Sequence, residues 1–218
     1  MGHIFDALAL GGSGSVISST DEHEELYNDA VKHLSVGKED VVLDAGCGTG
    51  AVTFEIAKLC HHIVGFDISR ESIRIARQRA KQEGKLNIEF HLGELECPDA
   101  IEGLKNYEVY DKILVFRSLH HLPQLYKENS MVKLYSMLKP GGRIVIGDLM
   151  AFEPPEQHRS SWLEIGYDGG LTDRIESVDF HIKFLNFIGC DVKIERIHAL
   201  LGIVVGYKKD REHGLFKN

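Results

Sequence analysis

The sequence is poor in the residues that mark several classes of protein. Its 218 residues include only 4 cysteines, 5 prolines and 1 tryptophan. The cysteines form no C-x-x-C pair, so they indicate neither a zinc site nor a disulfide framework. A chain without such a framework suits a reducing compartment, and we expect a cytoplasmic protein that holds no metal. The four positions are Cys47, Cys60, Cys97 and Cys190.

The chain also has no block of basic residues and no long apolar run. Its 33 acidic residues exceed its 25 basic residues, for a formal net charge of -8. Phosphate backbones bind to clustered cations, so this balance argues against DNA and disfavours an RNA substrate. No apolar stretch reaches the length of a membrane span, and the early segment IFDALAL carries an acid. We expect no membrane span, and the sequence leaves a homodimer open.

The chain does contain an alternation of strand-like apolar segments with helix-like amphipathic segments. Hydrophobic residues make up 43% of it, enough for one large core. Periodicity and turn residues predict helices at residues 21–34, 50–59, 69–84 and about 122–138. Strands are predicted at residues 40–45, 62–67, 87–92, 110–116 and, beyond a Pro-Gly-Gly turn, within 138–149.

The end of the chain departs from this alternation. A helix is predicted at residues 177–189, with Phe180, Phe184, Phe187 and Ile188 on one stripe. The strands DVKIERI and LGIVVGYKK follow, and the short link between them permits only an antiparallel hairpin. We therefore predict an α/β fold: a Rossmann-like, doubly wound, seven-stranded sheet, mostly parallel, that ends in a C-terminal antiparallel hairpin.

The segment VLDAGCGTG, residues 42–50, places three glycines directly after a predicted strand. Gly46, Gly48 and Ala51 satisfy the G-x-G-x-x-G/A dinucleotide pattern, and Asp67 lies where that pattern has its ribose-binding acid. A nicotinamide oxidoreductase is therefore one interpretation. Asp44, however, precedes the turn, where a carboxylate would repel a pyrophosphate and attract a cationic ligand.

As an ordered set, the segments LDAGCGTG, VGFDIS, FHLGELECP, YDKILVFRSLHHL and LKPGGRIVIGD resemble the class I S-adenosylmethionine-dependent methyltransferases. The resemblance runs from about Val41 to Leu149, and the closing hairpin extends it to Lys208. It is strongest to the small-molecule branch that includes the ubiquinone and menaquinone methyltransferases. It implies methyl transfer from S-adenosylmethionine to a small-molecule substrate. A protein or RNA methyltransferase, or a cofactor-binding partner protein without catalysis, remains an alternative.

The resemblance also implies which residues contact the cofactor. The glycine turn would face the methionine end, Asp67 would accept both ribose hydroxyls, and Ile68 would pack on the adenine. Glu94 stands where the family usually has an Asp that reaches the adenine amino group, and it is one methylene longer. The carbonyl of Phe116 would face the methionine ammonium. The full set is Asp44, Gly46, Gly48, Thr49, Gly50, Asp67, Ile68, Gly93, Glu94, Leu95 and Phe116.

The run RSLHHLP follows the fourth strand, where the family's substrate meets the methyl group. An imidazole there could take a proton from a hydroxyl or an acidic carbon, and we favour His121 over His120 as the catalytic residue. The alternative is that these rings cap the next helix or pack beneath it. Arg117 is placed either to hold a substrate carboxylate or phosphate or to lie on the surface.

We expect a single methyltransferase domain with four parts: an N-terminal arm and helix at 1–36, a cofactor-binding core at 37–149, a substrate lid at 150–176, and a C-terminal helix and hairpin at 177–209. The arm could fold over the site about the glycine-rich segment 11–15. The long lid is expected to select the substrate, and its only tryptophan either contacts substrate or anchors the lid. Its candidate residues are His158, Arg159, Trp162 and Tyr167.

Overall fold

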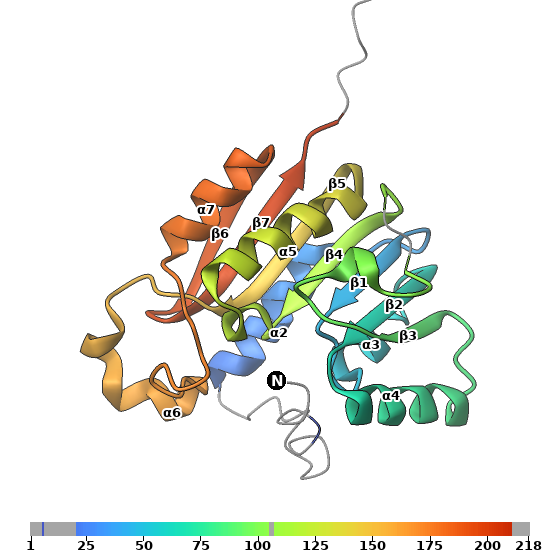
Figure 1. Ribbon diagram of the computed structural model, residues 1–218, viewed down its shortest axis with the longest axis horizontal. Coiled ribbons are helices and arrows are strands. Elements are labelled where there is room, and N and C mark those ends of the chain that lie inside the picture. The colour runs from blue at the N-terminus through green and yellow to red at the C-terminus, as the bar shows by residue number, and fades with distance from the viewer. Residues whose placement is uncertain (1–5, 7–20, 105–106, 211–218) are drawn as a thin grey trace, which may run out of the picture.

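The computed structural model of the protein describes residue 6 and residues 21–104 and 107–210. In this part of the chain seven strands form one sheet, in the order β3-β2-β1-β4-β5-β7-β6 (Figure 1). Strands β1 to β5 pair in parallel, and β7 runs antiparallel to both β5 and β6. The predicted α/β fold with its C-terminal hairpin is confirmed. The strands are β1 Val41–Ala45, β2 His62–Asp67, β3 Ile88–Leu92, β4 Tyr110–Phe116, β5 Leu138–Leu149, β6 Cys190–His198 and β7 Leu201–Lys208.

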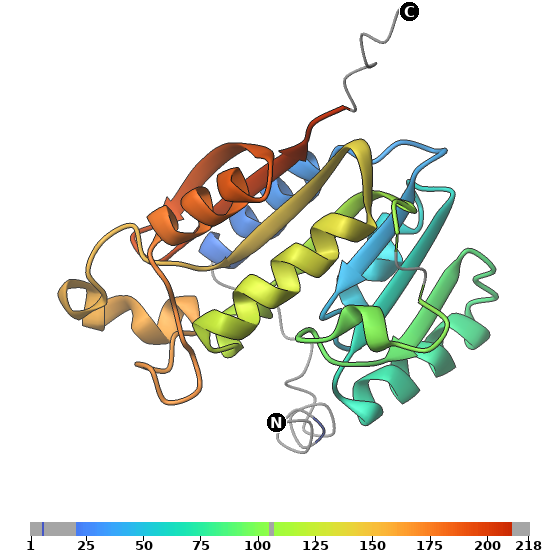
Figure 2. The same ribbon diagram turned by 45° about the horizontal axis from the view of Figure 1, so that its top comes forward.

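Helices cover both faces of the sheet, and Figure 2 shows α5 and α7 together on one of them. Helices α2 (Asp21–Leu34), α3 (Ala51–Ile56) and α4 (Arg70–Gln82) bury their apolar stripes in one core cluster. Helices α5 (Gln124–Met137) and α7 (Val178–Phe187) pack into a second cluster on the opposite face. The short α6 (Trp162–Ile165) lies in the predicted lid. The 3-10 helices are η1 Pro98–Ala100, η2 Leu119–His121 and η3 Pro155–Ser161.

Strand β1 lies between β2 and β4, and this position determines where a ligand can bind. The chain runs outward from β1 to β2 and β3, and then returns to β4 on the other side of β1. The loops after β1 and β4 therefore leave the sheet in opposite directions, and in open α/β sheets ligands bind at such a point, beyond the carboxyl ends of the strands. Asp44 sits near the end of this central strand, paired with Gly65 of β2 and Leu114 of β4.

Local signals in the sequence explain the boundaries of α4. The side chain of Ser69 accepts a hydrogen bond from the backbone N–H of Ser72, at 3.0 Å, and so caps the helix. Gly84 follows the helix end with a φ of 62°, in the left-handed region where a side chain would be strained. Both features agree with the sequence analysis. None of the described helices is long and apolar enough to cross a membrane.

Two details of the C-terminal half differ from the expectation. The Pro-Gly-Gly turn does not precede β5 but forms part of it, where the pairing with β4 is irregular between Tyr110 and Lys112. Phe187 is 84% exposed, because His181 and Leu185 occupy the buried face of α7 in its place. The predicted hinge at 11–15 lies outside the described residues.

Helix α5 provides a test of how much the second core cluster stabilises the fold. Leu134 is 0% exposed in that cluster, whereas Leu125, on the same helix, is 65% exposed. Leu134→Ala removes buried methyl groups and leaves a cavity, so it should lower the free energy of unfolding by about 2–5 kcal/mol. Leu125→Ala should change it by no more than about 0.5 kcal/mol. Urea unfolding measures both, and equal losses would contradict the assigned packing.

Candidate functional site

The glycine turn between β1 and α3 lies at the carboxyl end of the central strand. Gly46, Gly48 and Gly50 have φ values of 83°, 53° and 85°, a region that glycine adopts without strain. The backbone N–H of Gly46 donates to the carbonyl of Phe66 at 2.9 Å, which folds the turn back onto the end of β2. A Cβ on Gly46 would lie 2.5 Å from the side chain of Ser118, beyond β4. Glycine at this position therefore lets the ends of β1 and β4 approach closely.

Asp67, the last residue of β2, links three loops at this edge of the sheet. Its Oδ2 accepts the N–H of Gly48 and its Oδ1 accepts the N–H of Ser69, each at 2.8 Å. Its backbone carbonyl accepts the N–H of Gly93 at 3.0 Å. Burial raises the pKa of the carboxyl, while the two N–H groups and the nearby His121 oppose the rise. Each carboxylate oxygen has a second lone pair, so it can still accept a hydroxyl group.

Asp44 is deeply buried beside the same turn, with only 1% of its surface exposed. Its Oδ2 accepts a hydrogen bond from the hydroxyl of Thr53 on α3, at 2.6 Å. Burial has the largest effect on its pKa, and together with the charge of Asp67 it outweighs the Thr53 bond and raises the pKa to about 7. At neutral pH the carboxyl is therefore near its titration midpoint, and a cationic ligand group would favour the charged form.

The other predicted cofactor residues lie along the same edge, with different degrees of burial. Leu95 is buried, and its carbonyl accepts the hydroxyl of Ser130 at 2.6 Å. Glu94 is exposed. Phe116 ends β4, and its ring meets the ring of Tyr27 edge-on at 6.2 Å. Their contacts with a ligand stay predictions. Among the members of the set other than the glycine turn, Asp44 and Asp67, the half-buried ones are Thr49, Ile68, Gly93 and Phe116.

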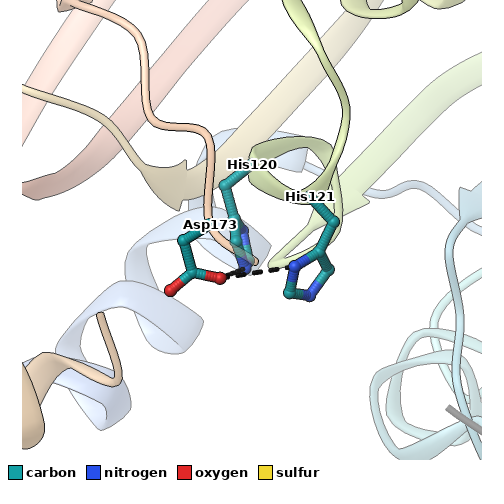
Figure 3. Close-up of side chains that lie close together, drawn as sticks. All are labelled: His120, His121 and Asp173. Carbon is teal, nitrogen blue, oxygen red and sulfur yellow. Dashed lines mark ion pairs between the residues drawn. The ribbon is translucent and has the colours of Figure 1, made fainter. Parts of the chain in front are cut away.

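Three polar side chains from two distant segments meet beyond β4 (Figure 3). His120 and His121 come from η2, and Asp173 comes from the lid. Asp173 Oδ1 lies 3.5 Å from His120 Nε2 and 3.3 Å from His121 Nδ1. His120 and Asp173 are buried, whereas 24% of the His121 side chain is exposed. The second ring nitrogen of His121 points away from Asp173, so the predicted catalytic residue is the accessible member of this cluster.

Asp148, at the end of β5, fixes His120 from the other side. Its Oδ1 bonds to Nδ1 of the His120 ring, and its Oδ2 accepts the backbone N–H of the same residue at 3.1 Å. Burial alone would raise the pKa of Asp148, but His120, the N–H of Leu149 and Arg117 together lower it to about 2. A charged carboxylate only accepts hydrogen bonds, so Nδ1 of His120 carries the proton and Nε2 faces Asp173. His120 thus packs as a fixed, oriented ring.

Arg117 belongs to the same site and is not a surface residue. Its side chain is half-buried, and it donates to Nε2 of His23 on α2. Burial lowers the pKa of its guanidinium, and the charges of Asp148 and Asp173 oppose this. Its φ of 49° is uncommon for a residue with a side chain, and such strain concentrates at functional sites. A role in holding an anionic substrate group stays a prediction.

The lid is held together by its own side chains. The indole N–H of Trp162 donates to a backbone carbonyl within the lid at 3.1 Å, and the ring meets Tyr167 edge-on at 5.0 Å. The guanidinium of Arg159 lies 5.5 Å from the Trp162 ring centre, and His158 pairs with Glu153 at 2.7 Å. These contacts favour the interpretation in which Trp162 anchors the lid.

Three acids of this region were not predicted from the sequence. Asp148 ends a strand as Asp44 and Asp67 do, so the same positional rule could have found it. Asp173 carries no local signal, since only the path of the lid brings it to the histidines. Asp6 is the one described residue of the arm, and its Oδ1 accepts from Ser69 Oγ at 2.8 Å beside the start of α4.

Comparisons with known proteins agree with this architecture. The family model described as "Methyltransferase domain" matches residues 37–201. An uncharacterized RNA methyltransferase of Lactococcus lactis is 40% identical over 78 residues, which are 36% of this chain and 15% of that protein. A demethylmenaquinone methyltransferase of Tropheryma whipplei is 32% identical over 117 residues, which are 54% of this chain and 45% of that protein. The chain thus spans less than half the length of either relative.

A solved structure shows the same fold over nearly the whole chain. The magnesium protoporphyrin IX methyltransferase ChlM from Synechocystis PCC 6803, with bound SAH, superposes with a TM-score of 0.73. The superposition covers 95% of this chain and 98% of that chain, at 15% sequence identity. At this identity the likeness concerns the fold alone.

The raised pKa of Asp44 predicts a pH dependence of stability. In the unfolded chain its pKa is about 3.9, against about 7 in the fold. Between these values the folded protein keeps a proton that the unfolded chain has lost, so this group lowers the free energy of unfolding as the pH rises, by at most about 1.4 kcal/mol per pH unit. Asp44→Asn removes this pH dependence, because an amide side chain does not titrate in this range. Its free energy of unfolding, relative to that of the unmodified protein, should therefore rise from pH 4 to pH 7.

Urea unfolding at several pH values measures this difference. Asp191→Asn is the matched control, because the Asp191 side chain is 74% exposed and its substitution should give a nearly flat difference. A flat difference for Asp44→Asn as well would show that the buried carboxyl is charged across this range.

Proposed function

The chain belongs to the methyltransferase domain family, and from this we propose that it transfers a methyl group from S-adenosylmethionine to a small molecule. The observation that supports this best is the pair of carboxyls on either side of the glycine turn, Asp44 and Asp67, because the cofactor offers a matching group to each. A bound S-adenosylmethionine would supply a methyl group already activated on a sulfonium, so the protein has mainly to align it and exclude water.

Asp67 suits the adenosine end of this cofactor. Its two oxygens are fixed by the N–H groups of Gly48 and Ser69, which orients the carboxylate before any ligand arrives. The remaining lone pairs can each accept a ribose hydroxyl, and hydrogen bonds to a charged group contribute about 1.5–3 kcal/mol each. By the family resemblance, the adenine would lie beside Ile68 and Glu94.

Asp44 suits the amino-acid end. Its pKa of about 7 means that the charged form is costly in the ligand-free site, and an ammonium or sulfonium group would stabilise that form. A pyrophosphate in the same place would do the opposite, which disfavours a nicotinamide cofactor. The close approach at Gly46, where a Cβ would clash with Ser118, leaves backbone rather than side chains beside the ligand.

A small-molecule acceptor is favoured over RNA. The Tropheryma whipplei relative is named for demethylmenaquinone, and it matches more of this chain than the Lactococcus lactis relative named for RNA. The match to the latter covers only 15% of that protein. The net charge of -8 would also repel a phosphate backbone. Four free cysteines support a cytoplasmic location for this activity.

His121 is the proposed proton acceptor. His121 Nδ1 lies 3.3 Å from Asp173 Oδ1, and in the tautomer with its proton on Nδ1 the lone pair is on Nε2, which points away from the carboxylate (Figure 3). A histidine oriented by a carboxylate in this way can take a proton through its second nitrogen. As the acceptor atom forms its bond to the methyl carbon, its proton would move to His121 Nε2, and the sulfonium would become a neutral thioether.

Ligand binding tests the cofactor assignment. S-adenosylmethionine and SAH should raise the melting temperature, and NAD and NADP should not, since a ligand at about 100 times its Kd adds roughly 2.7 kcal/mol. In calorimetry, Asp67→Ala should weaken the binding of both adenosine and S-adenosylmethionine. Asp44→Asn should weaken mainly the latter. A shift with NAD alone, or equal losses on both ligands for both variants, would contradict the proposal.

Turnover tests His121. SAH formation is followed with a panel of phenols, hydroxy acids and quinols, including reduced demethylmenaquinone, in buffer with a chelator. His121→Ala should lower turnover about 10²–10⁴-fold with little change in cofactor Kd, because the ring acts on the acceptor. The control is His61→Ala, at an exposed position before β2. If His121→Ala kept full turnover per folded molecule, the ring would have a packing role and would not be the proton acceptor.

A further inference from the structure

The cluster of His120, His121 and Asp173 has the composition and shape of a metal site. We propose that these three side chains bind one divalent transition-metal ion, of which Zn²⁺ is the representative. The cysteines gave no reason to expect a metal, and this site uses none of them. Its three donor atoms lie within 4.8 Å of one another, two of them on η2 and one in the lid (Figure 3).

The donor types select the class of ion. Two imidazole nitrogens with one carboxylate oxygen suit zinc and its neighbours, whereas Mg²⁺ and Ca²⁺ favour sites made of oxygen atoms. Two histidines and one carboxylate, with a fourth position open to water, form a known zinc ligand set. Asp148 and Asp173 place two carboxylates here, and their charges act on the cations of Arg117 and Lys127.

The distances agree with an ion better than with direct hydrogen bonds. Asp173 Oδ1 lies 3.5 Å from His120 Nε2 and 3.3 Å from His121 Nδ1. A charge-assisted hydrogen bond between such groups would be about 2.7–2.9 Å. A tetrahedral zinc ion with bonds of about 2.0–2.2 Å would hold its ligand atoms about 3.3–3.6 Å apart. The two measured separations fall in that range.

His120 is oriented as a metal ligand. Its Nδ1 bonds to Asp148, so Nε2, which faces the carboxylate of Asp173, is the nitrogen that an ion would bind in place of a proton. Both groups are buried, with 3% and 4% of their side chains exposed, and two electron-rich atoms facing each other in a buried site are stabilised by a cation between them. A carboxylate behind a ligating histidine is also the usual second layer of a zinc site.

An ion here would join the lid to the segment after β4. Asp173 is the ligand that the lid supplies. Its Oδ2 already accepts the backbone N–H of Asp168 at 2.8 Å, and this bond fixes the carboxylate to the surrounding loop. Ion binding and proton acceptance by His121 exclude each other, because an ion on Nδ1 keeps the proton on Nε2. This last point rests on the proposed function, whereas the binding of the ion does not.

The experiment uses the full chain, stripped with EDTA and then titrated with Zn²⁺ or Co²⁺. We expect one ion per chain by calorimetry, and a Co²⁺ visible spectrum of the tetrahedral type. Asp148→Asn should weaken binding about 10–100-fold, as the loss of a second-layer partner does. His121→Ala and Asp173→Asn should weaken it more. Zn²⁺ should also slow amide hydrogen exchange in residues 166–174.

The control His158→Ala removes another histidine–carboxylate pair, His158 with Glu153, and should leave binding unchanged. Melting curves in EDTA show which variants fold. Because the His121 ring is partly exposed, His121→Ala is the variant least expected to disturb folding. Binding that survives both His121→Ala and Asp173→Asn, or that is lost in His158→Ala, would overturn the site. So would the absence of binding to the unmodified protein. Each of these readings is independent of methyl transfer.

Discussion

The constraint on which this structure depends is the burial of carboxyl groups at the carboxyl ends of parallel strands. Asp44, Asp67 and Asp148 each lie at the end of a strand, where side chains leave the sheet and converge. A buried carboxyl must be protonated, hydrogen-bonded or paired. Asp44 is held near its titration midpoint, Asp67 takes backbone N–H groups, and Asp148 takes an imidazole. Through these interactions the three carboxyls position the glycine turn, the start of α4 and the histidine pair.

Where the fold follows from local patterns, the sequence is sufficient to predict it. Apolar runs mark the inner strands because both of their faces are covered, and the short link before Leu201 leaves only a hairpin. Ser69 and Gly84 mark the ends of α4 because a cap and a left-handed turn require those residue types. The exposure of Phe187 was not predictable in the same way, since periodicity alone does not say which side of a helical stripe meets the sheet.

Some residues of the candidate site could likewise be predicted from the sequence, and others could not. The cofactor positions follow from residues at strand ends and from a family resemblance, and the structure brings Asp67 and the glycine turn into direct contact. Asp173 could not be predicted, because it follows Gly169 and Gly170 in an irregular segment and meets His121 only through the path of the lid. The local sequence around either residue does not indicate a contact between residues that are 52 positions apart. The proposed metal site could not be predicted either, because its three ligands are brought together by the fold and not by their spacing in the sequence.

The separate origin of Asp173 has a consequence for how this protein can diversify. The groups proposed to hold the cofactor come from strand ends, which the sheet keeps in place, whereas the acid that contacts the two histidines comes from a connection with its own internal anchors. Loops of this kind tolerate insertions and deletions that strands do not. A change of lid would therefore alter the surroundings of the two histidines, while the strand-end residues proposed to hold the cofactor stayed in place. In such a scaffold, natural sequence variation would concentrate in the lid.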